Sequence, residues 1–193
     1  MNLISNSPHG NGIYTFINKK DKLIIKSSLT KTGIASLKRE LSGYQWYFNV
    51  ENNNNYNNSP IVSFSNDKYH RLCIQLFSGQ TGNSNLSLSA NYLLILKAFE
   101  HYVSIWPTKK DVFVPLHGDF SVGNIIYNKE DIVIIDWEHF ENNSAPWGFD
   151  LVNMLYESVY FSMVPKNKLS ISNEKYFLLL RNKISELLND VPN

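Results

Sequence analysis

The sequence has little cysteine, no excess of charge of either sign and no long hydrophobic run. Its single cysteine, Cys73, excludes an internal disulfide and is typical of proteins in a reducing compartment. Cys73 lies between two aliphatic residues with no base beside it, so we expect a buried thiol and not a nucleophile. The net charge of +1 provides no field that would attract nucleic acid or an anionic membrane.

Membrane insertion and targeting signals are also missing. No apolar run approaches the roughly 20 residues that a membrane-spanning helix needs. The first residues lack the basic and apolar regions of a targeting segment. A chain of 193 residues can bury a sizeable core and, by length alone, forms one domain or one two-lobed unit. We therefore expect a cytoplasmic protein with no membrane span and no nucleic-acid partner.

The residues that carry chemistry are concentrated in the second half of the chain. A His-Gly-Asp motif occupies 117–119, Asn124 follows Asp119 by five residues, and Asp136 ends the apolar run at 132–135. Phosphoryl transfer needs a carboxylate that orients an attacking hydroxyl and accepts its proton, together with hard oxygen ligands for Mg²⁺. We therefore predict Asp119 as the catalytic base, and Asn124 and Asp136 as the metal ligands.

Together with a Gly-Phe-Asp-Leu motif at 148–151, this pattern resembles the catalytic core of the aminoglycoside phosphotransferase and choline kinase family. The resemblance is close across residues 112–155 and looser towards the N-terminus. It implies that His117 and Asp150 brace the catalytic loop and take no part in the chemistry. The alternative is a coincidence of turn formers, because a lone aspartate after a strand usually caps its own backbone.

The resemblance implies an α+β, protein-kinase-like fold of two lobes, an N-terminal lobe at 1–79 and a mainly helical C-terminal lobe at 80–193. Alternating apolar residues predict the strands of a small antiparallel sheet, at 2–7, 13–17, 23–27, 59–64 and 69–77. Apolar residues spaced three and four apart predict one helix in the N-terminal lobe and others beyond it, at 34–48, 86–105, from 148 onward and around 176–188.

Two residues of the N-terminal lobe are predicted to meet. Lys26 ends the apolar run of the third strand, and Glu40 lies at the edge of the apolar stripe of the first helix, whereas Lys38 points away from that stripe. In the resembling fold such a glutamate orients a lysine on the nucleotide phosphates. The alternative is a surface glutamate paired along its own helix, which contributes under about 1 kcal/mol.

The resemblance implies further nucleotide contacts. Gly10 and Gly12 lie in the first turn, where glycines let backbone N–H groups approach the phosphates. Two glycines are equally typical of an ordinary hairpin turn. The segment from Gln75 through Phe77 to Gly79 would receive the base of the nucleotide through backbone groups, and a plain linker between lobes fits it equally well.

The acceptor is expected to be a small hydroxyl-bearing molecule or a glycan precursor. The segment between Asp136 and Asp150 is too short for the peptide-docking platform of protein kinases. Only 43 residues follow Asp150, so we expect a minimal or differently built acceptor region. Glu138 is either a further metal or acceptor contact or an ordinary strand-end glutamate.

The sequence thus predicts an Mg²⁺-dependent phosphotransferase that uses ATP or GTP and phosphorylates an alcohol group. One alternative is a catalytically inactive, kinase-like module that binds a nucleotide or another protein. Another is a sugar- or amine-binding protein with an aromatic platform of Trp137, Trp147 and Tyr156. The oligomeric state and the choice between ATP and GTP are left open.

Overall fold

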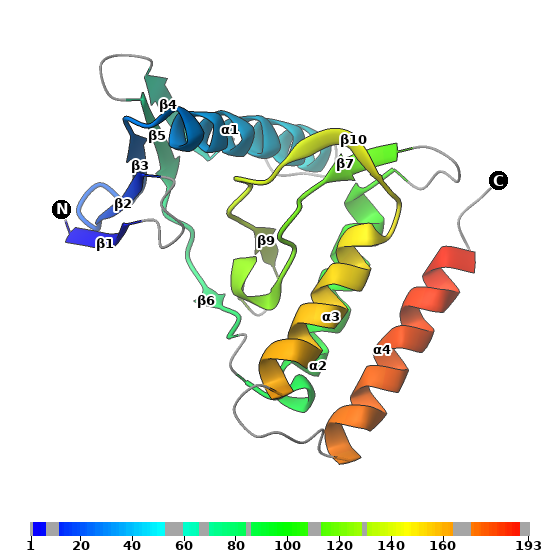
Figure 1. The fold of residues 1–193 in the computed structure, drawn as a ribbon. Coiled ribbons are helices and arrows are strands. Elements are labelled where there is room, and N and C mark those ends of the chain that lie inside the picture. The colour runs from blue at the N-terminus through cyan, green and yellow to red at the C-terminus, as the bar shows by residue number, and fades with distance from the viewer. Residues whose placement is uncertain are drawn as a thin grey trace. The chain divides into compact units, whose positions relative to one another are not determined.

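The structure is a computed structural model, and it describes residues 2–6, 12–52, 60–65, 70–83, 86–107, 113–128, 131–163 and 171–189. These residues form four α-helices and small antiparallel sheets (Figure 1), which confirms the predicted α+β class. The chain divides into a first unit, Met1–Phe77 with Asp136–Phe140, and a second unit, Ser78–Ile135 with Glu141–Asn193. The short segment Asp136–Phe140 therefore belongs with the N-terminal part of the chain.

The first unit contains a five-stranded antiparallel sheet in the order β1-β2-β3-β5-β4. Its strands are β1 (Asn2–Asn6), β2 (Ile13–Asn18), β3 (Leu23–Ser28), β4 (Ile61–Ser65) and β5 (His70–Gln75). They agree with the predicted strands, whose ends at Ser7, Ser59 and Tyr69 lie outside the described residues. Lys26 lies on the central strand β3, where it pairs with Thr15 of β2 and Leu72 of β5. Pairing on both sides fixes its position in the sheet.

Helix α1 (Lys31–Asn52) packs against β3, β4 and β5 (Figure 1). It begins three residues before the predicted start, because the Thr30 hydroxyl accepts the N–H of Gly33 at 3.0 Å and caps the helix. Three residues of the predicted apolar stripe are buried, namely Leu37, Tyr44 and Phe48. Glu40 is buried beside this stripe, as its position in the sequence predicts.

Aromatic packing holds the segment Asp136–Phe140 against α1. The Trp137 ring is fully buried, and its centroid lies 5.7 Å from that of Trp46 and 5.2 Å from that of Tyr47. The Phe140 ring lies 5.9 Å from Trp46 and 5.9 Å from Trp137. Buried aromatic pairs of this kind contribute through both area and ring geometry. They explain why this segment groups with residues about 90 positions earlier in the chain.

The second unit is built around three helices that contact one another, α2 (Leu88–Ile105), α3 (Phe149–Met163) and α4 (Ile171–Asn189). One small sheet has the order β6-β8-β9, with β6 (Gln80–Thr81), β8 (Ile125–Tyr127) and β9 (Ile132–Ile134). A second pairs β7 (Phe113–Leu116) with β10 (Glu141–Pro146). The helices agree with the predicted ranges, whereas the β7–β10 pair is not predicted.

An aromatic cluster ties the segments of the second unit together. The Tyr102 and Trp106 rings stack at a centroid distance of 4.2 Å, and Phe120 and Trp147 pack beside Tyr102. Trp106 Nε1 donates to the carbonyl of Pro115 at 2.6 Å. The Tyr102 hydroxyl accepts the N–H of Gly148 at 3.2 Å. The end of α2 therefore anchors both β7 and the start of α3.

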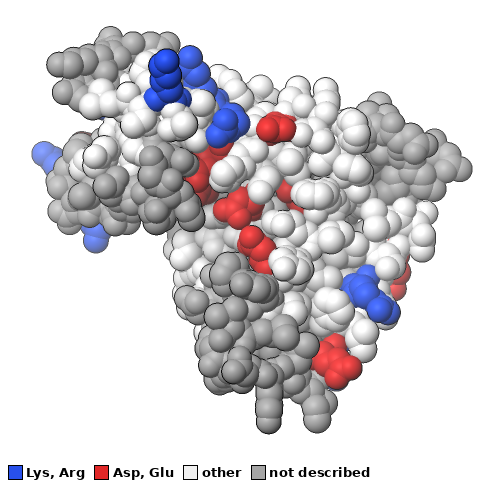
Figure 2. Space-filling view, in the orientation of Figure 1, with Lys and Arg blue, Asp and Glu red and all other residues white. Residues whose placement is uncertain are grey.

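One face of the molecule carries few charges on its described residues. Figure 2 shows a face on which most of the described surface belongs to residues other than Lys, Arg, Asp and Glu, in keeping with a charged fraction of 18%.

No helix in the described part of the chain has the length and apolar character needed to cross a membrane. Cys73 is a buried free thiol, as predicted.

Candidate active site

Three side chains of the first unit form a largely buried ion cluster. Lys26 Nζ lies 2.7 Å from Glu40 Oε1 and 2.5 Å from Asp136 Oδ1. The Glu40 side chain is fully buried, Lys26 is 13% exposed and Asp136 is 36% exposed. The predicted contact between Lys26 and Glu40 is therefore present. Asp136 joins it from a position 110 residues farther along the chain.

Burial and neighbouring charges shift the pKa values of Lys26 and Glu40 in opposite directions. Burial lowers the pKa of Lys26, but the carboxylates of Glu40 and Asp136 outweigh it and raise that pKa above its ordinary value. Burial raises the pKa of the Glu40 carboxyl, an effect that Lys26 opposes. Lys26 therefore keeps its positive charge at neutral pH. Removing it would leave two carboxylates facing each other, one of them with no access to water.

The cluster has bonding capacity beyond its internal contacts. An ammonium group has three N–H donors, and Glu40 and Asp136 accept two of them. Among the described residues, Glu40 Oε2 is buried without a hydrogen-bond partner. The remaining donor of Lys26 suits an anionic oxygen such as that of a phosphate. The partly exposed carboxylate of Asp136 has the hard oxygen chemistry that Mg²⁺ prefers.

The backbone around Asp136 is held by two further residues of α1. Asp136 has a left-handed φ of 65°, which is uncommon for a residue with a side chain. Its N–H donates to the Tyr44 hydroxyl at 3.3 Å. Arg39 Nε donates to the Glu138 carbonyl at 2.7 Å. The sequence does not identify either contact, and its one signal is that Tyr44 lies a helical turn after Glu40 on the same face.

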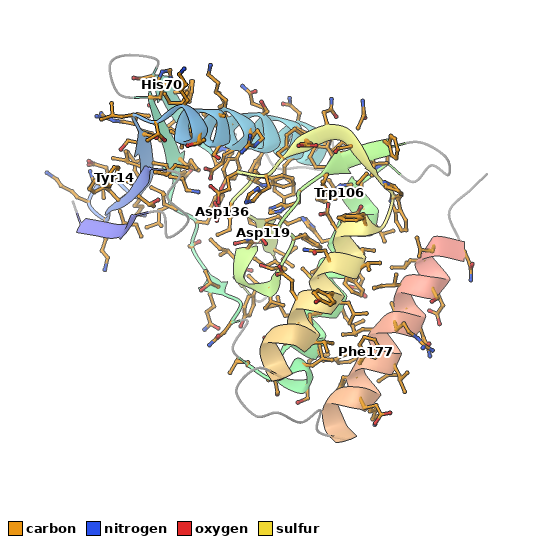
Figure 3. All side chains as sticks on the ribbon, viewed as in Figure 1. Tyr14, His70, Trp106, Asp119, Asp136 and Phe177 are labelled. Carbon is orange, nitrogen blue, oxygen red and sulfur yellow. The ribbon has the colours of Figure 1, made fainter. Side chains whose placement is uncertain are left out.

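The loop that follows β7 in the second unit carries Asp119 (Figure 3). The backbone N–H groups of His117 and Gly118 donate to the two carboxylate oxygens of Asp150, at 2.9 and 3.2 Å. The His117 ring accepts the N–H of Asp119 at Nδ1, 3.2 Å away, so Nε2 carries the proton and donates to the Ile135 carbonyl at 3.0 Å. His117 and Asp150 therefore hold the backbone that carries Asp119.

Two carboxyls of α3, the buried Asp150 and the partly buried Glu157, lie within electrostatic range of Asp119. Burial raises the pKa of Asp150 to about 6, the N–H groups of His117 and Gly118 oppose this, and the charge of Asp119 adds to it. Burial also raises the pKa of Glu157, and Asp119 contributes there too. The sequence gives no signal for Glu157, because a polar residue in the middle of a helix is ordinarily solvent-facing.

Asn124 contacts Asp119 directly. Its Nδ2 donates to the backbone carbonyl of Asp119 at 2.8 Å and to the carboxylate Oδ2 at 2.9 Å. Both bonds use the amide nitrogen, so they do not use the amide oxygen, which is the atom that binds a hard cation. Asn124 belongs to the second unit and Asp136 to the first. Within the described residues, no three His, Cys, Asp or Glu side chains gather into a metal site.

The predicted phosphate turn is described only in part. Gly12 has a left-handed φ of 68°, and a Cβ at this position would lie 2.6 Å from Thr30 Cγ2. Its carbonyl accepts the Ser28 hydroxyl at 2.8 Å. Gly10 lies outside the described residues. The turn thus requires glycine at position 12 for its own geometry.

The segment predicted to meet the nucleotide base is already bonded within the first unit. The Gln75 N–H donates to the Pro60 carbonyl at 2.7 Å. The Phe77 ring stacks on Phe48, with a centroid distance of 6.1 Å and an interplanar angle of 5°. The Gln75 N–H is therefore not a free donor, and Phe77 packs on α1.

The remaining residues that were predicted to contact a ligand differ in how exposed their side chains are. The Glu138 carboxylate lies 3.7 Å from His139 Nε2, beside it in the chain. The Trp137 and Trp147 rings are buried, whereas Tyr156 is 66% exposed. Two buried indoles cannot form an open platform for a sugar or an amine.

The chain matches no protein-family model and no curated protein. Its function is therefore inferred from the Lys26–Glu40–Asp136 cluster and from the loop that carries Asp119.

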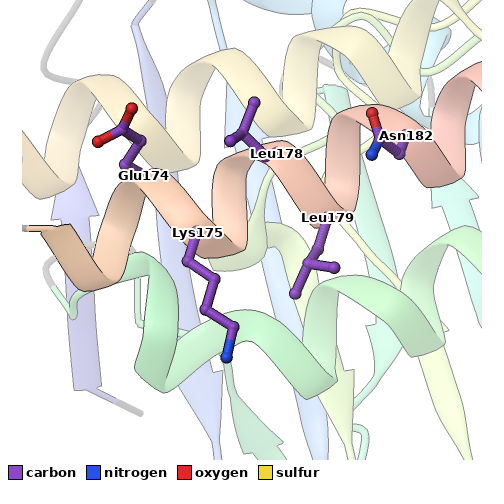
Figure 4. Close-up of a pocket in the computed structure, with 5 residues that line it drawn as sticks. All are labelled: Glu174, Lys175, Leu178, Leu179 and Asn182. Atoms are coloured by element: carbon purple, nitrogen blue, oxygen red, sulfur yellow. The ribbon is translucent and has the colours of Figure 1, made fainter.

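Two pockets of the second unit are lined by other residues. The first has a volume of about 360 Å³ and lies on α4 (Figure 4), lined by Glu174, Lys175, Leu178, Leu179 and Asn182. The second has a volume of about 430 Å³ and is lined by Gly79, Gln80, Lys97, Tyr127 and Asn128. Apart from Gly79, at the end of the expected base-contacting segment, neither contains a predicted site residue. Neither presents a carboxylate beside a buried lysine.

Proposed function

We propose that the protein is an Mg²⁺-dependent phosphotransferase of protein-kinase-like, two-lobed fold. It transfers the terminal phosphoryl group of ATP or GTP to a hydroxyl of a small molecule or glycan precursor. The observation that carries this proposal is the cluster of Lys26, Glu40 and Asp136. A strand lysine held by a helix glutamate and by an aspartate after an apolar strand is the arrangement that positions nucleotide phosphates in kinases.

In this proposal Lys26 binds the phosphates. The two carboxylates keep it charged and fix its direction before the nucleotide arrives, so little freedom is lost on binding. Asp136 and Asn124 are the residues that would hold Mg²⁺ through their side-chain oxygens. Bound there, the ion would supply positive charge to offset the charge that develops on the phosphoryl group.

Asp119 acts as the base. The acceptor hydroxyl oxygen forms the new bond to the terminal phosphorus as the bond to the leaving diphosphate breaks, and the hydroxyl proton passes to the Asp119 carboxylate. The Asn124 amide fixes the direction of that carboxylate through the 2.9 Å bond to Oδ2. His117 and Asp150 fix the backbone beneath it.

Phosphoryl transfer to a pool of small-molecule alcohols tests the proposal. The full chain is incubated with Mg²⁺ and ATP or GTP, and phosphorylated products are identified by mass spectrometry. Asp119→Asn keeps the shape of the side chain and removes the base, so we expect a loss of about 10²- to 10⁴-fold in rate. Asp131→Asn makes the same change at an exposed turn and should leave the rate unchanged.

An unchanged rate in Asp119→Asn would refute the assignment of the base. Binding of Mg²⁺ and ATP without transfer to any alcohol in the pool would instead favour the inactive nucleotide-binding module.

A further inference from the structure

Helix α1 also contacts Asp136 directly, without Lys26 between them. The Tyr44 side chain is 2% exposed, and its hydroxyl accepts the N–H of Asp136 at 3.3 Å. Tyr44 follows Glu40 by one helical turn, so both residues face the same side of α1. This face of α1 therefore holds Asp136 in two ways. Glu40 binds Lys26, which contacts the Asp136 carboxylate, and Tyr44 binds the Asp136 backbone N–H.

The backbone contact concerns a left-handed conformation that is uncommon for residues with a side chain, although aspartate adopts it more readily than most. At a φ of 65° the Cβ crowds the neighbouring carbonyl, which is why residues with side chains seldom occupy this region. The Tyr44 hydroxyl is aimed at the N–H of Asp136 in this conformation. Relaxation to a negative φ would reorient the Cα–Cβ bond, and the carboxylate would turn away from Lys26.

Close packing on both sides of Tyr44 makes this contact possible. A Cβ at Gly43 would lie 2.5 Å from the Cβ of Trp137, so only glycine allows α1 to approach the segment this closely. Arg39 bonds to the carbonyl of Glu138 from the same helix. Three consecutive residues, Asp136 to Glu138, are thus in contact with α1.

We propose that Tyr44 is a positioning residue that holds Asp136 in its left-handed, lysine-bound conformation, so that α1 couples the Lys26–Glu40 pair to the aspartate that binds Mg²⁺. The inference deepens the proposed function and depends on it for the role of Asp136. The hydrogen bond and its effect on the backbone do not depend on that function.

Amide hydrogen exchange of the full chain without nucleotide tests the backbone part. Tyr44→Phe removes the hydroxyl and keeps the ring, so we expect the Asp136 N–H to exchange about 3- to 10-fold faster, the factor that one hydrogen bond supplies. Tyr47→Phe is the matched control, because Tyr47 is a buried tyrosine of the same helix whose ring packs on Trp137. Unchanged exchange at Asp136 in Tyr44→Phe overturns the proposal, whether or not the protein transfers phosphate.

A calorimetric titration of Mg²⁺ into the protein with ATP tests the coupling. In Tyr44→Phe we expect the apparent affinity for Mg²⁺ to fall by the same 3- to 10-fold, while the affinity for ATP without Mg²⁺ stays the same. A general loss of packing would lower both affinities, and that result contradicts a positioning role. Faster exchange at Asp136 in a protein that binds no nucleotide supports the backbone contact and refutes the proposed function.

Discussion

Asp150 shows at the scale of one residue how the second unit fixes its loop. Its two carboxylate oxygens each accept one backbone N–H, from His117 and from Gly118. A carboxylate suits this position because it offers two acceptors and no donor. Burial makes its charge unfavourable, as its pKa of about 6 indicates, so the two N–H bonds are what keep the ionised group in place.

We expect Asp150→Ala to lower the free energy of unfolding by about 2 to 4 kcal/mol at pH 7, because two N–H groups would be left without an acceptor. Urea denaturation measures this change. Asp131→Ala removes a carboxylate from an exposed turn and should cost under about 1 kcal/mol. Equal stability of the two variants would mean that Asp150 does not hold the loop.

Some residues of the site can be predicted from the sequence, and others cannot. Asp119 and Asp136 each follow an apolar strand run, so the pattern of apolar residues alone places both near the ends of strands. Glu40 is predictable from its place beside a helical stripe. Tyr44 is not, because a tyrosine within that stripe is ordinarily core and its partner lies 92 positions away.

At the scale of elements, α1 assembles the site of the first unit. The helix carries Glu40, which contacts Lys26, and Tyr44, which its close approach at Gly43 brings within hydrogen-bonding distance of Asp136. The distance between α1 and the segment Asp136–Phe140 is therefore part of the site.

We expect Gly43→Ala to force the helix and this segment apart, since the new Cβ would lie 2.5 Å from Trp137 Cβ and 2.8 Å from its Cγ. Overpacking of this kind costs about 1 to 3 kcal/mol. Thermal and urea unfolding measure the loss. Ser42→Ala, at the adjacent exposed position, should be close to neutral, and a neutral Gly43→Ala would show that the contact is loose.

Most elements could be predicted because their apolar residues recur at a period of two or of three to four. Strand β10 could not be predicted. It contains Asn142, Asn143 and Ser144, which are turn formers, and Asn143 has a left-handed φ of 51°. Its strand character comes from pairing with β7, a contact that no local pattern encodes.

At the scale of the whole molecule, two groups of opposite kind, the partly buried base His101 and the buried acid Asp150, titrate below neutral pH. Burial lowers the pKa of His101 from 6.5 to about 4, so the folded state resists a proton that the unfolded state accepts. Its contribution to stability is therefore lost as the pH falls from 6.5 to 4. Burial raises the pKa of Asp150 from 3.8 to about 6, so its contribution to stability increases as the pH falls from 6 to 3.8.

We expect His101→Gln to remove the loss of stability that His101 causes at acidic pH. Relative to wild type, the free energy of unfolding of the variant should increase as the pH falls from 7 to 4, because glutamine has no proton to bind. Urea denaturation at several pH values gives the difference curve. A difference that does not change with pH would mean that His101 is solvated in the folded state.

The grouping of Asp136–Phe140 with the first unit is also a property of the whole molecule. The partners of Trp137 and Phe140 lie on α1, far earlier in the chain, so their packing follows from the tertiary structure alone. The sequence places the boundary of its N-terminal lobe at residue 79. It gives no sign that a later segment joins that part of the chain.

Calorimetric titration of ATP into the full chain, with and without Mg²⁺, tests most directly the claim that the Lys26 cluster is a nucleotide site. We predict Mg²⁺-dependent binding by the wild-type protein and a loss of at least about 10-fold in affinity for Lys26→Met, the factor expected when a charge-assisted hydrogen bond is lost. Lys38→Met, at an exposed position of helix α1, should bind as wild type does. Circular dichroism checks that each variant is folded. Equal affinity of folded Lys26→Met and wild type, or no binding by wild type, would contradict the account.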